Sequence, residues 1–306
     1  MIIINITDKE AGYGACDTSV IALGNFDGVH IAHTALLSKT VAVAREKNIS
    51  SAVFTFSEHS GKILRSRNVS SITSLNEKLE LFRKIGIDKV YLADFEKVRD
   101  YTPSRFVDEI LKKKINAEFA VCGYDFRFGV RGTGNSSDLT DLMDGNTYVM
   151  PPVMKGNEVV SSTLIRKAIE DGDVGYAKEL LGRPFFIEFP VVHGKELGRS
   201  IGVPTINQNF PEGFVVPKNG VYACRVNTDM GEFSGVANVG VHPTVETSNR
   251  VNCETFIIGF DGSLYDKTIR VSFYKRLRDE KKFDSLDALK AQIEKDIEIT
   301  KDYFKN

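Results

Sequence analysis

The sequence predicts two domains: an α/β domain built on a parallel sheet, followed by a small antiparallel β-barrel that ends in a C-terminal helix. Up to about residue 182, short apolar runs alternate with segments of helical apolar spacing, which is typical of a Rossmann-like parallel sheet with helices on both faces. Beyond residue 184 the runs are short, alternating and rich in glycine, as in an antiparallel barrel. We therefore place the domains at residues 1–184 and 185–306.

The elements of the first domain follow from apolar runs and helix start signals. Ser74 and Glu77 form a capping box in front of one helix. Thr102 followed by Pro103 begins another. Strands are expected at residues 20–23, 52–56, 89–92, 119–122 and 147–150.

In the second domain, the expected strands are residues 185–192, 221–226, 233–239, 254–258 and 269–273. Asp284 or Ser285 can cap the final helix. Its apolar residues recur every three or four positions, which favours packing against the barrel over a partner-binding surface; they are Leu286, Leu289, Ile293 and Ile297.

Composition and cysteine usage exclude several classes of protein. At 306 residues the chain can form two cores, and its net charge of -1 argues against a nucleic-acid or anionic-membrane partner. The four cysteines are widely separated and form no CxxC pair, so neither a disulfide framework nor a zinc site is expected; they are Cys16, Cys122, Cys224 and Cys253. Without a signal peptide or a membrane-spanning run, a cytoplasmic protein is expected. No sequence feature indicates an oligomeric state.

The most informative segment is GNFDGVHIAHT, residues 24–34, which follows the strand at 20–23 and begins a helix. His30 and His33 are expected on one face of the first turn. A helix N-terminus has unpaired N–H groups and a positive dipole end that stabilise anions, while Gly24 and Gly28 permit close backbone approach. The segment predicts a phosphate site, although two such histidines also fit an ordinary polar turn.

This segment resembles the GxFDGxHxGH signature of the HxGH-type nucleotidyltransferases, with Ala32 in place of the glycine between the histidines. Two other segments, one at the end of an expected strand and one just after a strand, are similar to elements of the same family. Residues 53–59, VFTFSEH, resemble TFxPHP without its prolines. Residues 123–134, GYDFRFGVRGTG, suit a loop that closes over a planar ring, and Asn135 follows where the family has an acid. Near His59, basic residues either reach phosphates or lie on a solvated loop; they are Lys62, Arg65 and Arg67.

Residues 161–166, SSTLIR, fit a helix cap with a surface arginine, but they also resemble the SSTxIR element of the FMN adenylyltransferase half of bifunctional riboflavin kinase/FAD synthetases. That resemblance implies attack by the FMN phosphate on the α-phosphorus of ATP, giving FAD and pyrophosphate. It assigns charge stabilisation to His30 and His33, supported by Arg166. It implies ligand binding by Gly24, Asn25, Phe26, Asp27, Gly28, Asp125, Phe126, Arg127, Phe128, Ser161, Ser162 and Thr163, with Asn25 and Asp27 toward ATP and the 126–128 segment toward the flavin.

The second domain opens with HGKELGRSIGVPTIN, residues 193–207. Thr205 and Asn207 are two apart on an extended segment, so they point the same way and offer the oxygen ligands that Mg²⁺ prefers. The run resembles the riboflavin kinase signature GxxxGRxxGxPTxN. The resemblance implies binding of the substrates by Gly194, Lys195, Gly198, Gly202 and Pro204.

Later segments extend the resemblance to riboflavin kinases. Residues 235–244, GVANVGVHPT, resemble GVANxGxRPTF, with His242 and Val245 as departures. Glu254, in an otherwise apolar strand, is either a solvent-facing residue or, as the resemblance implies, the catalytic base. In residues 264–283, Asp266 replaces a glycine, and Arg278 is either a flavin contact or half of a surface salt bridge.

Together these motifs identify the chain as similar to prokaryotic bifunctional riboflavin kinase/FAD synthetases. The resemblance implies ATP-dependent phosphorylation of riboflavin to FMN and adenylylation of FMN to FAD, with Mg²⁺ and ATP. Two alternatives remain open at this point: a riboflavin kinase with a weakened adenylyltransferase half, and a non-catalytic flavin or nucleotide sensor. A nucleic-acid-binding protein is disfavoured by the charge balance.

Overall fold

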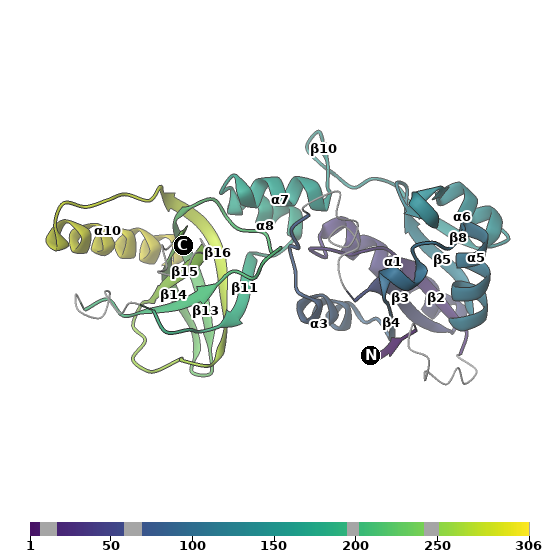
Figure 1. Ribbon diagram of the computed structural model, residues 1–306, viewed down its shortest axis with the longest axis horizontal. Helices are drawn as coiled ribbons and strands as arrows, with labels where there is room; N and C mark the ends of the chain where they lie inside the picture. The colour runs from purple at the N-terminus through teal and green to yellow at the C-terminus, as the bar shows by residue number, and fades with distance from the viewer. Residues whose placement is uncertain (7–16, 58–68, 195–201, 242–250, 306) are drawn as a thin grey trace. The chain divides into compact units, whose positions relative to one another are not determined.

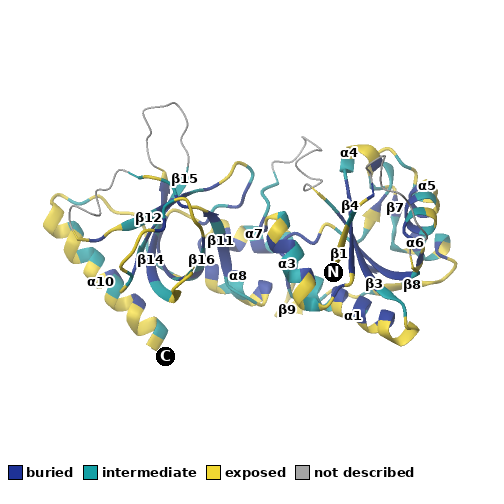
Figure 2. Cartoon of the chain, turned by 90° about the horizontal axis from the view of Figure 1, so that it is seen from below, coloured by how far each residue is buried: buried dark blue, intermediate teal, exposed yellow. Residues whose placement is uncertain are grey.

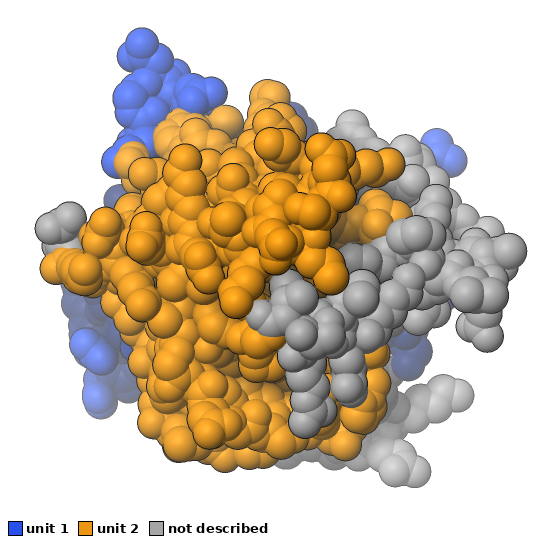
Figure 3. Space-filling view, turned by 90° about the vertical axis from the view of Figure 1, so that its left-hand side faces the viewer, with its two compact units in different colours: residues 1–162 blue, residues 163–306 orange. Residues whose placement is uncertain are grey.

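The computed structural model describes residues 1–6, 17–57, 69–194, 202–241 and 251–305. The chain divides into two compact units, residues 1–162 and 163–306 (Figure 3). The predicted boundary after residue 184 stays a prediction. Several residues singled out in the sequence lie outside the described residues: Cys16, His59, Lys62, Arg65, Arg67, Lys195, Gly198, His242 and Val245.

The first unit is built on a six-stranded sheet in which every pair of neighbours is parallel (Figure 1). Its order is β1-β4-β3-β2-β5-β8, and the strands are β1 (Ile2–Asn5), β2 (Ser19–Leu23), β3 (Ser50–Phe56), β4 (Lys89–Ala93), β5 (Ala117–Gly123) and β8 (Thr147–Met150). The predicted parallel α/β fold is confirmed. The prediction omitted β1, a short strand at the edge of the sheet.

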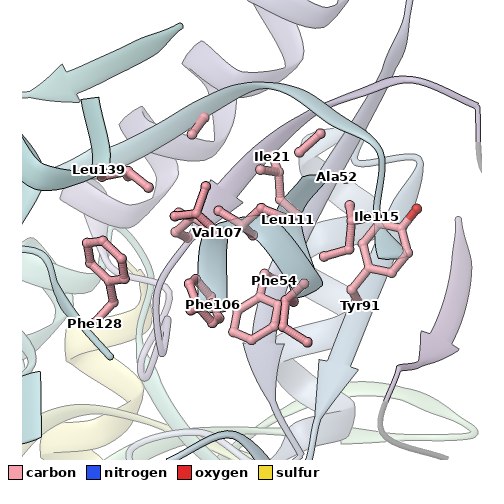
Figure 4. Close-up of a cluster of buried hydrophobic side chains, with 14 of the residues drawn as sticks. Ile21, Ala52, Phe54, Tyr91, Phe106, Val107, Leu111, Ile115, Phe128 and Leu139 are labelled. Carbon is pink, nitrogen blue, oxygen red and sulfur yellow. The ribbon is translucent and has the colours of Figure 1, made fainter. Parts of the chain in front are cut away.

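Alternating residues of the buried strands face two separate apolar cores. On one face, Val20 and Ala22 share a core with Leu37 of α1 (Ile31–Lys47) and Phe82 of α3 (Leu75–Ile85). On the other, Ile21 and its neighbours pack with Phe106 of the π-helical η1 (Phe106–Lys114) and Leu139 of α6 (Ser136–Leu142) (Figure 4). Buried strands between partly exposed helices give the layered pattern in Figure 2.

The helix start signals also act as predicted. Ser74 and Glu77 exchange the two bonds of a capping box at α3, and Thr102 caps α5 (Pro103–Arg105), which leads into η1. The shorter elements of this unit are α4 (Phe95–Val98), η2 (Val130–Gly132) and two small hairpins, β6 (Arg127–Phe128) with β7 (Gly134–Asn135) and β9 (Met154–Lys155) with β10 (Glu158–Val159).

The second unit contains a curled antiparallel sheet. Helices α7 (Ser162–Glu170) and α8 (Val174–Leu181) precede it. Its order is β11-β16-β13-β14-β15-β12, with strands β11 (Phe185–Pro190), β12 (Thr205–Asn209), β13 (Gly220–Thr228), β14 (Gly231–Val241), β15 (Val251–Ile257) and β16 (Thr268–Arg278).

Gln208 joins the first and last strands of that order. Its side-chain amide, fully buried, donates to the carbonyls of Phe189 on β11 (2.7 Å) and Ile269 on β16 (2.8 Å). The backbone N–H of Val192 donates to the carbonyl of Asn207 at 2.8 Å. The sheet is thereby curled into the predicted barrel, which confirms the second fold class.

Helix α10 (Leu286–Lys305) closes the chain and packs over β13 and β14. Ser285 caps it, accepting from the N–H of Ala288 at 3.2 Å. Phe304 packs edge-on against Tyr274, with ring centroids 5.1 Å apart. Leu286, the first residue of the predicted apolar stripe, is 64% exposed and takes little part in this packing.

Candidate active sites

Two of the predicted motifs begin at the same edge of the parallel sheet. Segment 24–34 follows β2 and segment 123–134 follows β5, and these strands are hydrogen-bonded neighbours. The strand order reverses direction between them, because β3 and β4 lie on one side of β2 while β5 and β8 lie on the other. Ligands of open α/β sheets bind at such a switch point, beyond the carboxyl ends of the strands.

The turn formed by residues 24–29 has an unusual backbone. Phe26 and Val29 have φ angles of 50° and 38°, and Gly28 has one of 82°. A residue with a side chain in this left-handed region costs on the order of 1 kcal/mol or more. The turn must therefore be held by contacts from outside it.

Asp27 supplies one of these contacts through its buried carboxylate. The carboxylate accepts hydrogen bonds from the backbone N–H groups of Ile72 (3.0 Å) and Thr73 (3.3 Å). Thr73 also accepts from the N–H of Gly28 at 3.1 Å. The family resemblance places Asp27 toward ATP. In the structure, its carboxylate accepts hydrogen bonds that hold the turn in place.

His30 and His33 lie together at the start of α1. His30 is the N-cap, and its Nδ1 accepts from the backbone N–H of His33 at 3.3 Å. The two imidazoles are stacked, with centroids 3.6 Å apart and planes 16° apart. Since Nδ1 of His30 is an acceptor, the proton of its neutral ring belongs on Nε2.

The pKa of His33 lies well below its usual value of 6.5. Burial is the main cause, followed by the positive charges that His30 and Lys78 can carry. Nδ1 of His33 is buried and has no hydrogen-bond partner among the described residues. His33 is therefore neutral at pH 7 and offers a ligand a ring N–H group rather than a full positive charge.

The loop after β5 combines core and surface residues. Phe128 is buried and contacts Phe106, with centroids 5.7 Å apart. Phe126 is half-buried and stacks on Phe128 at 5.5 Å, while Asp125 and Arg127 are exposed. Phe128 therefore belongs to the apolar core and supports the more accessible ring of Phe126.

Asn135, which stands where the family has an acid, caps α6. Its side-chain oxygen accepts from the N–H groups of Ser137 (2.8 Å) and Asp138 (3.2 Å). The carboxylate of Asp138 in turn accepts from the N–H of Asn135 at 2.9 Å. An amide oxygen performs this capping as well as an acid does.

The 161–166 segment reaches the histidine turn through Ser162, whose hydroxyl donates to the carbonyl of Asp27 at 2.9 Å. Ser161 is half-buried and precedes α7. Thr163 is exposed, and Arg166 lies half-buried one turn into α7. Thr163 and Arg166 belong to the second unit.

In the barrel, three polar residues form a row across adjacent strands. Asn207 on β12 lies directly opposite Glu254 on β15, and Glu254 lies directly opposite Asn238 on β14. Side chains paired in this way have Cβ atoms about 5 Å apart on the same face of the sheet. The structure therefore brings a predicted metal ligand and the predicted base together.

Neighbouring residues orient the amide of Asn207, which is 6% exposed. Its Oδ1 accepts from the side-chain amide of Asn252 at 3.1 Å. Gly194 lies against it, since a Cβ built on Gly194 would be 2.7 Å from Cγ of Asn207. Thr205 lies two residues earlier on the same face of β12, after the exposed Gly202 and Pro204.

Sequence reasoning missed Lys78, Asn238 and Asn252. Lys78 interrupts the apolar pattern of its helix between Leu75 and Phe82, and Asn238 lies among small or apolar residues from position 233 to position 241. Each of these two residues is polar at a position where the periodicity predicts an apolar residue, and this departure is the sequence signal that could have identified them. Arg278, one of the predicted flavin contacts, is bonded to Asp296 of α10.

Comparisons with known proteins show which family the chain resembles. A FAD synthetase family model matches residues 15–164, and a riboflavin kinase family model matches residues 181–304. Proteins named bifunctional riboflavin kinase/FMN adenylyltransferase are similar over most of the chain. The one from Bacillus subtilis (strain 168) is 34% identical over 94% of this chain and 93% of its own, and the one from Escherichia coli (strain K12) is 35% identical over 93% and 92%.

A solved structure is also similar. A crystal structure from Streptococcus pneumoniae, described as a macrolide-efflux protein, has a TM-score of 0.89 and 33% identity, covering 98% of this chain and 99% of that one. Within the described parts of the chain, no helix is long and apolar enough to cross a bilayer. Given the identity to the relatives over nearly the full length, the chain belongs to the bifunctional riboflavin kinase/FMN adenylyltransferase family.

Proposed function

We propose that this protein phosphorylates riboflavin to FMN with ATP, and then transfers the adenylyl group of a second ATP to FMN, releasing pyrophosphate and forming FAD. The observation that carries the proposal is the presence of two separate sites. The stacked His30 and His33 lie in the first unit, and the Asn207–Glu254 pair lies in the second. Each lies within the residues that the corresponding family model matches.

The first site suits adenylyl transfer because this reaction needs little from the protein beyond positioning and charge stabilisation. The FMN phosphate is already an anion, so no protein nucleophile is required. His30 and His33 would donate ring N–H groups to phosphate oxygens as charge develops on the leaving pyrophosphate. In this proposal Phe126 offers a ring face to the flavin.

The second site suits kinase chemistry. The terminal ribityl hydroxyl of riboflavin must lose a proton as it attacks the γ-phosphate of ATP. Glu254 is a half-buried carboxylate on the strand beside Asn207, and it would accept that proton as general base.

The residues on β12 fit the magnesium ion that the family implies. Asn207 and Thr205 present an amide and a hydroxyl oxygen on the same face, and Gly194 leaves space where any side chain would overlap the Asn207 amide. Among the described residues, no three His, Cys, Asp or Glu side chains are grouped to hold a metal. Thr205 and Asn207 would therefore hold Mg²⁺ together with nucleotide phosphates, and the ion would offset their charge.

The proposed partners are the small-molecule substrates riboflavin, FMN and ATP, in the cytoplasm. The net charge of -1 argues against a nucleic-acid or anionic-membrane partner.

One assay tests the whole proposal. The purified protein is incubated with riboflavin, ATP and Mg²⁺, and the flavins are separated by chromatography. Formation of FAD is expected. FMN alone would indicate a weakened adenylyltransferase, and unchanged riboflavin would favour a flavin or nucleotide sensor.

A further inference from the structure

Lys78 of α3 is a charged residue in a buried position. Its side chain is only 7% exposed, and it lies on the face of the helix that also carries the fully buried Phe82. Burying an ammonium group is costly unless it is paired. Leucine or methionine would satisfy the apolar pattern of this helix, so the lysine calls for a reason other than packing.

The Nζ atom of Lys78 contacts the turn that precedes the two histidines. It donates to the backbone carbonyl of Asn25 at 2.8 Å. The hydroxyl of Thr55 on β3 donates to the same oxygen at 3.2 Å. Two donors from two different elements therefore converge on one carbonyl at the start of the turn.

That turn is the part of the first site that most needs support. It contains Phe26 and Val29 in the left-handed region, and it ends at His30. Phe26 also packs edge-on against His33, with centroids 5.2 Å apart. A displacement of the backbone at Asn25 would thus move both histidines: His30 through the chain of the turn, and His33 through its contact with the Phe26 ring.

We propose that Lys78 is a positioning residue for adenylyl transfer: its ammonium group holds the 24–29 turn in the conformation that presents His30 and His33 to the phosphates. The inference rests on the proposed adenylyltransferase activity of this site. Thr55 assists Lys78 at the same carbonyl, and the Asp27 carboxylate anchors the other half of the turn.

The charges around Lys78 are consistent with this role. Burial lowers the pKa of Lys78, and the nearby Asp27 carboxylate raises it. Lys78 in turn contributes to the low pKa of His33, after burial and His30. The neighbouring carboxylate of Glu77 belongs to the capping box of α3, where it accepts from the N–H of Ser74 at 2.6 Å.

The test compares Lys78→Met with Lys84→Met. Methionine keeps the length and packing of Lys78 without its charge. Lys84 lies on the same helix but is 63% exposed and paired with Glu80. In Lys78→Met we expect kcat for FAD formation from supplied FMN to fall roughly 100-fold, as small misplacements of catalytic groups do, with a much smaller change in KM. Lys84→Met should keep the wild-type kcat.

Riboflavin phosphorylation, measured on the same samples, is the internal reference and should be unchanged in both variants. Thr55→Val provides a second, uncharged test, because it removes the other bond to the Asn25 carbonyl while keeping the shape of the side chain. It should lower the same kcat roughly 10-fold. Wild-type kcat in both Lys78→Met and Thr55→Val would overturn the proposal.

A readout independent of activity is the pKa of His33, followed by NMR. It should rise toward 6.5 in Lys78→Met, because a nearby positive charge is removed, and stay unchanged in Lys84→Met. An unchanged His33 pKa in Lys78→Met would contradict the proposed proximity. If the wild-type protein makes no FAD, the proposed function fails. If it makes FAD and both Lys78→Met and Thr55→Val match its kcat, only the present inference fails.

Discussion

Arg278 and Asp296 form a charge-assisted pair that joins the end of β16 to helix α10. The Nε and Nη2 atoms of Arg278 lie 3.0 and 2.8 Å from Oδ2 of Asp296. Asp296 is 2% exposed, and its other oxygen accepts from Gln292 at 2.9 Å. The carboxylate is thus fully engaged within the protein, in the geometry that makes arginine–carboxylate pairs strong.

Asp296→Ala should destabilise the second unit by about 2–3 kcal/mol. This is less than the 3–5 kcal/mol typical of breaking a fully buried pair, because the Arg278 side chain is 23% exposed. The measurement is urea unfolding followed by circular dichroism. Asp302→Ala removes an exposed partner of Lys305 and should change stability by less than about 0.5 kcal/mol. Equal effects of the two variants would contradict the anchoring role of Asp296.

Replacing either histidine should abolish most FAD synthesis. His30→Ala or His33→Ala removes one donor to the phosphates, and loss of one such donor commonly costs about 10²–10³ in kcat. The rate of FAD formation from FMN and ATP is measured, with riboflavin phosphorylation as the control. Wild-type FAD formation in either variant would show that the stacked pair does not contact the phosphates.

The low pKa of His33 predicts acid sensitivity of the first unit. The unfolded chain binds a proton at His33 below about pH 6.5, whereas the folded protein binds it only at lower pH. Stability from this group is therefore complete above pH 6.5 and is lost as the pH falls toward the folded-state pKa. His33→Gln should show a smaller loss of stability between pH 7.5 and 5.5 in urea unfolding. An equally steep loss in the variant would assign the sensitivity to other groups.

Glu254→Gln should remove the kinase activity alone. Loss of a general base commonly costs about 10²–10⁴ in rate, so FMN formation from riboflavin should nearly cease while supplied FMN is still converted to FAD. Glu232→Gln, at an exposed position of the same barrel paired with Arg225, is the control and should leave both rates unchanged. Parallel loss of both activities in Glu254→Gln would contradict two separate sites.

Gly194→Ala should impair the kinase site through Asn207. The added methyl group would overlap the Asn207 amide, which is buried and bonded to Asn252. We expect a higher KM for MgATP in riboflavin phosphorylation and no change in FAD formation from FMN. Gly175→Ala, where the nearest atom to a Cβ is 3.5 Å away, should have no effect. An unchanged KM in Gly194→Ala would argue against magnesium binding through Asn207.

Features that depend only on residues close together in the sequence could be predicted from the sequence alone. The capping box at Ser74, the apolar strands β2 to β5, the antiparallel region and the helix beginning after Ser285 all correspond to local patterns of side-chain type. Periodicity and capping act over a few residues, so they are visible without knowing the fold. The motifs that carry the family resemblance are local in the same sense.

Only the tertiary structure decided which distant residues meet. Lys78 reaches Asn25 across 53 positions, and Asp27 reaches Ile72 across 45. The row of Asn207, Glu254 and Asn238 depends on the register of three strands. The order and register in which strands pair are set by packing of the whole chain, and a shift of one residue would turn each of these side chains to the opposite face. The sequence alone therefore determined the two fold classes and the motifs. The tertiary structure decided that Asp27 holds the turn, that Phe128 belongs to the core and that Arg278 pairs with Asp296.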